Sequence, residues 1–139
     1  MRQLTHQIAI KTHGRRLVDV TDQVCAWVAA SGMATGLLTV YIQHTSASLL
    51  INENYDADVI ADLERFFSRL IPDGDPLFVH TIEGPDDMPA HVRTALTQTH
   101  LSIPLLNGKP ALGTWQGIFL YEHRHESATR RLVLHLIGA

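Results

Sequence analysis

The sequence has a single cysteine, no cluster of basic residues and no long apolar run, and each absence narrows what the chain can be. Cys25 is the only cysteine among the 139 residues, so no disulfide forms within one chain. It lies in an apolar stretch, residues 24–28, where a buried and unreactive thiol is the expected state. No apolar run approaches the roughly 18 residues of a membrane helix, and no basic-then-apolar leader is present. We therefore expect a cytoplasmic domain with no membrane partner.

The charge balance is slightly acidic. Eleven Lys and Arg residues stand against 14 Asp and Glu residues, for a formal net charge of −3. A protein that binds duplex nucleic acid needs a positive stripe, and none is visible, so nucleic acid is not an expected partner. With 45% hydrophobic and 18% charged residues, the chain has enough apolar material for a core. Its length suits one domain, residues 1–139.

Histidine is abundant, with nine histidines against four phenylalanines. Imidazole binds metals and titrates near neutral pH, so the placement of these residues is informative. The chain has no His-Glu-x-x-His pattern, no cysteine pair and no glycine-rich phosphate loop. Candidate site residues must therefore be argued one at a time.

Apolar periodicity predicts strands near both ends of the chain. Residues 4–20 alternate around His13-Gly14, which predicts a β-hairpin. Asn107-Gly108 between two apolar runs predicts a second, tight hairpin. Further strands are expected at 36–44, 77–81, 101–106, 111–123 and 129–138, and helices at 21–31, 56–71 and 89–98. Because strands and helices do not alternate regularly, the pattern favours an α+β fold with a mixed, largely antiparallel sheet and about three helices.

The first candidate site is "HTSAS", at the end of the strand predicted at 36–44. His44 there takes the place of an apolar residue, and small polar residues follow it. These residues are Thr45, Ser46 and Ser48, and their hydroxyl groups and backbone amides are suited to phosphate oxygens. Asn52 and Glu53 follow within one short strand length. The alternative interpretation is a histidine at the edge of the core that is bonded to the backbone.

The second candidate is His91, which is expected in the first turn of the helix that Pro89 begins. The free amides and positive end of a helix favour an anion and a neutral imidazole, ready to bind a metal or donate to a phosphate. Asp86 and Asp87 precede it and supply carboxylates. The alternative is that both aspartates cap the helix beside an exposed histidine.

The third candidate is "GTWQG". Two glycines inside a strand suggest a bulge or a close approach of backbone. Trp115 between them is either a core residue or one wall of a pocket for a flat heterocycle, with Gln116 supplying amide recognition. Glu122 ends the same strand and points at a ligand, a metal or solvent. His80 ends another predicted strand and is a plausible third metal ligand.

Four segments together resemble the YjbQ-like family, also described as the secondary thiamine-phosphate synthase family. They are "HTSASLLINENYDADV", "DDMPAHVRTAL", "SIPLLNGKPALGTWQGIFLYEH" and "RRLVLHLIG", and they cover nearly the whole chain. The resemblance implies an α+β fold of bent, mixed sheets that assembles as a homotrimer with clefts near subunit boundaries. One position departs from the pattern: many members carry a histidine where this chain has Pro89.

The resemblance also implies an activity and a set of residues for it. The reaction joins a pyrimidine-methyl diphosphate to a thiazole phosphate and releases diphosphate, with a metal or anion held near the motif histidines. The catalytic residues would be His44, His91 and Glu53; the substrate-binding residues Thr45, Ser46, Asn52, Trp115 and Gln116; and the metal ligands His44, His91, Asp87 and Glu122. Carboxylates near a diphosphate favour Mg²⁺ as the cofactor, whereas paired imidazoles favour Zn²⁺.

Two alternatives to the transferase stay open at this point. A metal-dependent hydrolase acting on a phosphorylated small molecule would use two histidines and a carboxylate around one ion with an open position. A non-enzymatic trimer that binds an anion or small molecule would use the same histidines for recognition or at an interface.

Overall fold

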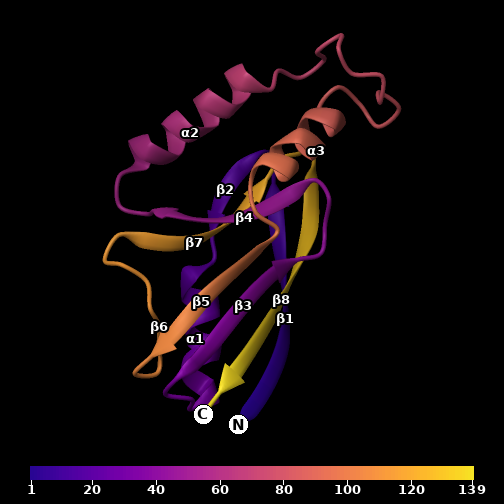
Figure 1. Ribbon diagram of the computed structural model, residues 1–139. Coiled ribbons are helices and arrows are strands. Elements are labelled where there is room, and N and C mark those ends of the chain that lie inside the picture. Colours follow the sequence, from indigo (N-terminus) through magenta and orange to yellow (C-terminus); the bar gives the residue numbers. More distant parts are fainter.

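The computed structural model describes residues 1–139 and contains two antiparallel sheets (Figure 1). In the larger sheet, strand β8 lies between β1 and β3. The sheet has the order β1-β8-β3-β5-β6, and the smaller sheet has the order β2-β7-β4. The strands are β1 (Arg2–His13), β2 (Arg16–Asp19), β3 (Gly36–Ile42), β4 (Ala47–Glu53), β5 (His100–Leu106), β6 (Lys109–Pro110), β7 (Gln116–Glu122) and β8 (Ser127–Gly138). Every pairing is antiparallel, so the fold is the predicted α+β class without the parallel pairs that a mixed sheet would contain.

The first turn of the chain separates the two sheets. The alternation in residues 4–20 was expected to give a hairpin, and this prediction is wrong. All of β1 pairs with β8, and β2 pairs with β7 in the other sheet. Gly14 has φ of +92°, a backbone conformation that favours glycine, and it redirects the chain between the sheets. Alternation predicts a strand but does not identify its partner.

The tight turn after β5 is confirmed. Asn107 and Gly108 both have positive φ, 51° and 79°, which is the combination that a type I′ hairpin turn requires. Leu105 pairs with Pro110, and Leu106 pairs with Lys109. The outer edge of β5 beyond this short pairing has no strand partner in the sheet order.

The helices are α1 (Thr21–Ser31), α2 (Ala57–Leu70) and α3 (Asp87–Leu96). Gly32 closes α1 in the left-handed conformation, and the Asp56 side chain caps α2 by accepting the N–H of Asp58. Helix α3 begins two residues before Pro89, which is its third residue, so His91 lies in the second turn rather than the first. None of the helices is long and apolar enough to span a membrane.

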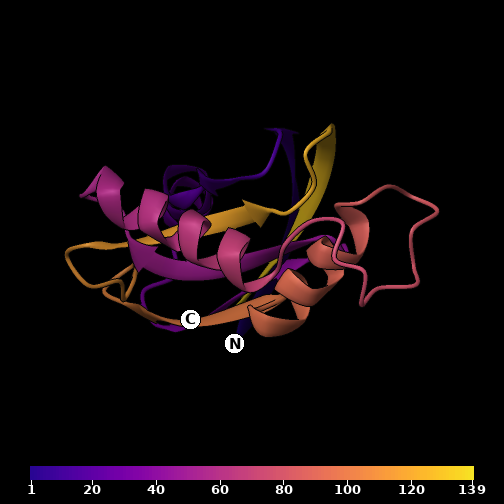
Figure 2. The ribbon, with the colours of Figure 1, turned by 90° about the horizontal axis from the view of Figure 1, so that it is seen from above.

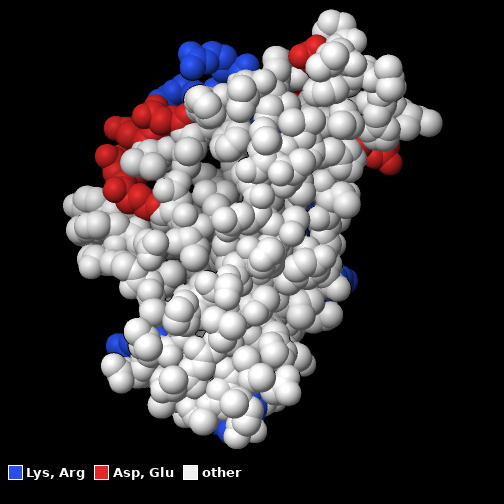
Figure 3. Space-filling model, in the orientation of Figure 1, with Lys and Arg blue, Asp and Glu red and all other residues white.

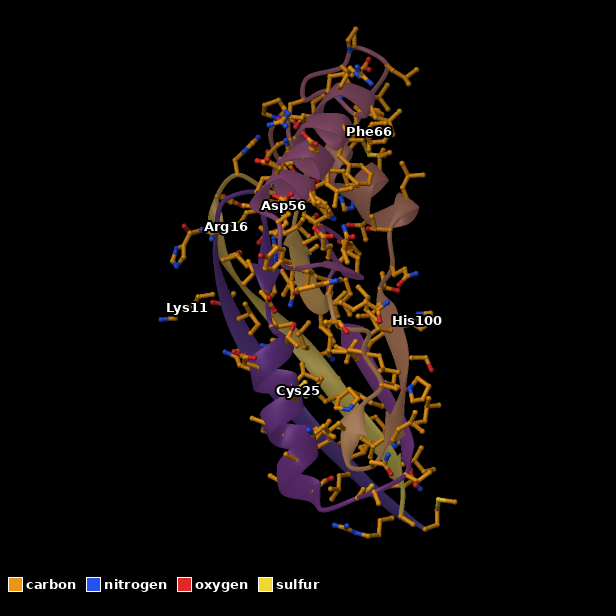
Figure 4. The ribbon with its side chains drawn as sticks, turned by 90° about the vertical axis from the view of Figure 1, so that its left-hand side faces the viewer. Lys11, Arg16, Cys25, Asp56, Phe66 and His100 are labelled. Atoms are coloured by element: carbon orange, nitrogen blue, oxygen red, sulfur yellow. The ribbon has the colours of Figure 1, made fainter.

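The main core lies between the larger sheet, α1 and the inner face of the smaller sheet. It contains apolar side chains of alternate positions on β3, β5 and β8. Cys25 is half-buried on α1, and Figure 4 shows it far from α2. Burial and the nearby Asp22 and Asp19 carboxylates raise the pKa of this thiol, which favours its protonated form.

Helix α2 covers the other face of the smaller sheet, and none of its residues is fully buried. A long segment, residues 71–86, then projects beyond α3 (Figure 2). The predicted strand at 77–81 does not exist: this part of the segment has no regular secondary structure, and Leu77 and Val79 are exposed. Asp73 anchors the start of the segment by accepting hydrogen bonds from Arg15.

Candidate functional site: a polar cavity between the first motif and α3

A cavity of about 480 Å³ lies where the turn after β3 meets α3 and the start of β8. Ten residues line it: His44, Thr45, Ser46, Glu83, Asp87, His91, Arg124, Glu126, Ala128 and Arg130. Only Ala128 is apolar, so the cavity is suited to charged or strongly hydrogen-bonding ligands. The structure therefore brings the first and second sequence motifs together, although they are more than forty residues apart in the chain.

His44 faces a hydrogen-bond donor at each of its ring nitrogens. The N–H of Ser46 lies 2.9 Å from Nδ1, and Nη1 of Arg130 lies 2.8 Å from Nε2. Burial and the adjacent Arg130 guanidinium lower the pKa of His44, so the neutral ring is favoured. A neutral ring that accepts from Ser46 carries its proton on Nε2, where the Arg130 donor also points. Two donors thus meet at one place, and an anionic oxygen there would accept from both.

His91 is positioned by α3 and by the first motif. Its Nδ1 lies 3.0 Å from the carbonyl oxygen of Thr45, to which it donates. The lone pair of Nε2 is then directed at Oδ2 of Asp87, 3.1 Å away and one helical turn earlier. Two acceptors face each other here, and either a proton or a cation must lie between them. A backbone carbonyl that orients the opposite nitrogen is the arrangement usual for histidines that bind metals.

The His80 imidazole and the Glu83 carboxylate complete a cluster of possible metal ligands around Asp87. Nε2 of His80 lies 2.7 Å from Oδ2 of Asp87 and 3.9 Å from the Glu83 carboxylate. One donor atom from each of His80, Glu83, Asp87 and His91 lies within 4.8 Å of the others. Burial raises the pKa of Asp87, but hydrogen bonding to His80 and the charge of Arg124 outweigh it, so the pKa is lowered and the carboxylate is ionised. Two imidazoles and two carboxylates fit a divalent transition metal, zinc above all.

Arg124 joins this cluster to the segment before α3. Its guanidinium donates to Oδ1 of Asp87 at 2.7 Å, to Oδ2 of Asp86 at 3.2 Å and to the carbonyl of Glu83 at 2.9 Å. Asp87 therefore presents one oxygen to Arg124 and the other to the histidines. This division leaves Oδ2 oriented toward the place where a cation would be held.

Glu122, predicted as a metal ligand, is instead part of a buried ion pair. Its carboxylate is fully buried and accepts from Nε and Nη2 of Arg130, both at 2.8 Å. The hydroxyl of Thr12 donates to the same carboxylate at 2.5 Å. These bonds use both carboxylate oxygens, so Glu122 positions Arg130 and does not line the cavity.

Four other predicted residues lie at the opposite end of the smaller sheet. Asn52 and Glu53 end β4, and Glu53 is paired with Gln116 at the start of β7. Trp115 lies just before β7 and is 55% exposed, so it is not a core residue. None of these four residues lines the cavity. The six residue steps of β4 that separate them from the first motif span roughly 20 Å.

The sequence reasoning missed Glu83, Arg124 and Arg130, and it considered His80 only in passing. Asp87 and His91 are four residues apart, and this spacing places them on one face of a helix. That signal was available in the sequence. The arginines carried no motif. The role of Arg130 depends on how β8 lies beside the first motif, and that of Arg124 on how the loop before β8 meets the start of α3.

Comparisons with known proteins agree with this fold. The family model described as "UPF0047 protein YjbQ-like" matches residues 6–139. The chain belongs to the YjbQ-like UPF0047 family. It is 47% identical over 137 residues to the UPF0047 protein sll1880 of Synechocystis, with 99% of this chain and 93% of that protein covered. It is 42% identical to the UPF0047 protein YjbQ of Escherichia coli O157:H7, with 98% and 97% covered.

Solved structures of other proteins have the same fold. The crystal structure of the hypothetical protein APE1520 from Aeropyrum pernix gives a TM-score of 0.89 at 30% identity, covering 98% of this chain and 99% of that one. A protein of the YjbQ/UPF0047 family from Clostridium acetobutylicum, described as uncharacterized, gives 0.87 at 31% identity, covering 95% and 99%. These names establish the family and the fold, and they assign no activity.

Proposed function

We propose that the chain is a metal-assisted enzyme acting on a small molecule that carries a phosphate or diphosphate group. One observation carries the proposal: a cluster of two histidines and two carboxylates adjoins two arginines and the HTS turn around one cavity. Metal ligands beside guanidinium groups and backbone amides form the usual environment for a bound phosphate ester.

The residues that would hold the ion are His80, Glu83, Asp87 and His91. A divalent ion bound there would neutralise charge on phosphate oxygens. The mutual approach of Asp87 Oδ2 and the His91 lone pair supports this assignment, because a cation relieves the contact between two acceptors. His44, predicted as a further ligand, has both ring nitrogens occupied by donors and is assigned to the anion instead.

The chain's own residues bind and orient the phosphate group. Arg130 is held rigidly by Glu122 and directs Nη1 toward the cavity beside His44. An anionic oxygen bound there would accept from this Arg130 donor and from His44 Nε2–H together. His44 then acts as a neutral hydrogen-bond donor with a fixed tautomer, and it would stabilise negative charge on a leaving phosphate oxygen without giving up its proton.

The specific reaction we propose is the one that the YjbQ-like resemblance implies. The ring nitrogen of the thiazole phosphate bonds to the methylene carbon of the pyrimidine, the carbon–oxygen bond to diphosphate breaks, and thiamine phosphate and diphosphate are released. The diphosphate is the group that the arginines and the ion would stabilise. We also propose that the protein assembles as a homotrimer, and that neither nucleic acid nor membrane is a partner.

A second candidate is hydrolysis of a phosphorylated small molecule. The two imidazole nitrogens of His80 and His91 favour it, because this donor set selects zinc over magnesium, and zinc sites with an open position activate water. The test removes the metal with a chelator and then adds back zinc or magnesium. Hydrolysis is favoured if zinc alone restores turnover and the product is inorganic phosphate.

The test incubates the metal-loaded protein with the pyrimidine diphosphate and the thiazole phosphate and measures thiamine phosphate. We expect product from the wild type and from His135→Ala, since His135 is bonded to Gln3 outside the cavity. His91→Ala is expected to be inactive while keeping the wild-type circular dichroism. Equal activity in His91→Ala would refute the assignment. If the wild type binds the substrates without turnover, the protein is a binding module and not an enzyme.

A further inference from the structure

We infer that a second, mainly apolar pocket beside the metal cluster holds the flat ring of the substrate, while the polar cavity holds its phosphate groups. This pocket, called the ring pocket below, lies within one chain between the loop of residues 74–85 and the start of α3. The inference rests on the proposed function, because it assigns the subsite for the organic part of the same substrate. The occupant is a heteroaromatic ring that carries an amino group and is joined to a diphosphate by a short link.

The polar cavity has no surface of its own for an organic group. Ala128 is the one apolar residue among the ten that line it. Sites for small organic molecules are lined mostly by apolar and aromatic side chains, with a few polar groups for orientation. The polar cavity supplies the polar groups alone, so the apolar part of the site must lie next to it.

The ring pocket has the missing composition. Its volume is about 300 Å³, and its walls include Phe78, Met88, three prolines and the imidazole of His80. Small-molecule sites have volumes of roughly 300–1,000 Å³, so this pocket is suited to a single ring and not to an extended molecule. Aromatic side chains and the polarisable thioether of methionine make favourable contacts with the face and edge of a flat ring.

His80 joins the ring pocket to the metal cluster. Its ring lines the pocket, and its Nε2 lies 2.7 Å from Oδ2 of Asp87, which lines the polar cavity. Glu83 also lines the polar cavity, and the next residue, Gly84, lines the ring pocket. The two spaces therefore adjoin at the proposed ion site. A ring that one methylene group joins to a diphosphate on the ion must lie beside that ion, and the ring pocket is the apolar space there.

The distribution of charge determines which end of the substrate enters which space. Residues 71–86 include four acidic residues and no Lys or Arg, and Figure 3 shows acidic but no basic side chains on this segment, at the upper right. Arg124 and Arg130 both line the polar cavity. A phosphate group is therefore attracted to the polar cavity and repelled from the ring pocket.

The walls of the ring pocket are held in place and include one carboxylate. The N–H of Gly74 donates to the carbonyl of Pro85 at 3.0 Å, which closes the loop at its base as in a compact Ω-loop. Oδ1 of Asp75 accepts the N–H of Leu77 at 2.9 Å, which leaves Oδ2 to accept from an amino group on the ring. Leu77 is 78% exposed, whereas its neighbour Phe78 is partly buried and lines the pocket.

The test compares two probes by calorimetry on the metal-loaded protein, without the thiazole phosphate. Inorganic diphosphate reports on the polar cavity alone, and the pyrimidine-methyl diphosphate reports on both spaces. Phe78→Ala removes a wall of the ring pocket. The matched control is Leu77→Ala, which shortens the adjacent side chain that faces solvent. Should Phe78→Ala unfold, Met88→Ala replaces it.

We expect Phe78→Ala to weaken binding of the pyrimidine compound by roughly tenfold, with the affinity for diphosphate unchanged within about twofold. Asp75→Asn should also weaken the pyrimidine compound alone, and Leu77→Ala should weaken neither probe. Equal wild-type affinity for the two probes overturns the inference, as does equal weakening of both in Phe78→Ala or a Leu77→Ala variant that matches it. An unchanged affinity in Asp75→Asn overturns the assigned amino contact. If diphosphate itself does not bind, the proposed function fails and this inference fails with it.

Discussion

Replacing Glu122 by glutamine should destabilise the protein strongly while leaving any metal binding intact. The carboxylate is fully buried, and it accepts two hydrogen bonds from Arg130 and one from Thr12. Glutamine keeps the shape but removes the charge, so the buried Arg130 guanidinium loses its counter-ion. Breaking a buried ion pair from one side costs about 3–5 kcal/mol. Typical domains have total stabilities of only about 5–15 kcal/mol, so this loss is large.

The measurement is urea unfolding followed by circular dichroism at a fixed protein concentration. With a slope of roughly 2 kcal/mol/M, the expected loss lowers the midpoint by about 2 M. Glu126→Gln is the control, because Glu126 is exposed and 3.7 Å from Arg124, and its loss should cost less than about 1 kcal/mol. Arg130→Met should cost about as much as Glu122→Gln, and the double variant less than the sum of the two. A loss below about 1 kcal/mol in Glu122→Gln would refute the assignment of Glu122 as the partner of Arg130.

Two further predictions concern pH and packing. Burial, followed by the charges of Arg93, Arg15 and Arg130, lowers the pKa of His123 to about 3. The unfolded chain binds this proton near pH 6.5, so the free energy of unfolding should fall as the pH drops from about 6.5 to about 3. His123→Gln should flatten that slope in urea titrations, and an unchanged slope would contradict the assignment. Gly117→Ala should cost about 1–3 kcal/mol because its methyl group meets Asn54 at 2.9 Å. Gly113→Ala, which meets only the flexible Gln116 side chain, should cost less, and thermal unfolding would show the reverse order if the argument were wrong.

The fold class was predictable because alternation and helical spacing are local properties of the sequence. Asn107-Gly108 fixed a turn through its own backbone preferences. The pairing of β1 with β8 could not be predicted, since it joins residues more than a hundred positions apart. The apolar letters at 77–81 predicted a strand, although Leu77 and Val79 are exposed and pair with nothing.

The candidate site was predictable only in part. Asp87 and His91 share one face of a helix, and the first motif follows a strand. Each of these two parts of the site could therefore be predicted from the sequence. That these parts meet depends on the bond between His91 and the Thr45 carbonyl, which is a tertiary contact. Glu122 was misassigned for the same reason. A carboxylate at a strand end can face a metal or an arginine, and only the position of Arg130 on β8 decides between them.

Zinc titration into the metal-free protein by calorimetry tests the central claim most directly, because it asks whether His80, Glu83, Asp87 and His91 together hold one cation. The account predicts one ion per chain. The affinity should fall in both His80→Ala and His91→Ala by more than the roughly 10–100-fold that loss of an outer-sphere partner costs. It should be unchanged in His13→Ala, which alters an exposed histidine outside the cavity. Zinc binding that is equally tight in His91→Ala and the wild type, or no binding to either, would contradict it.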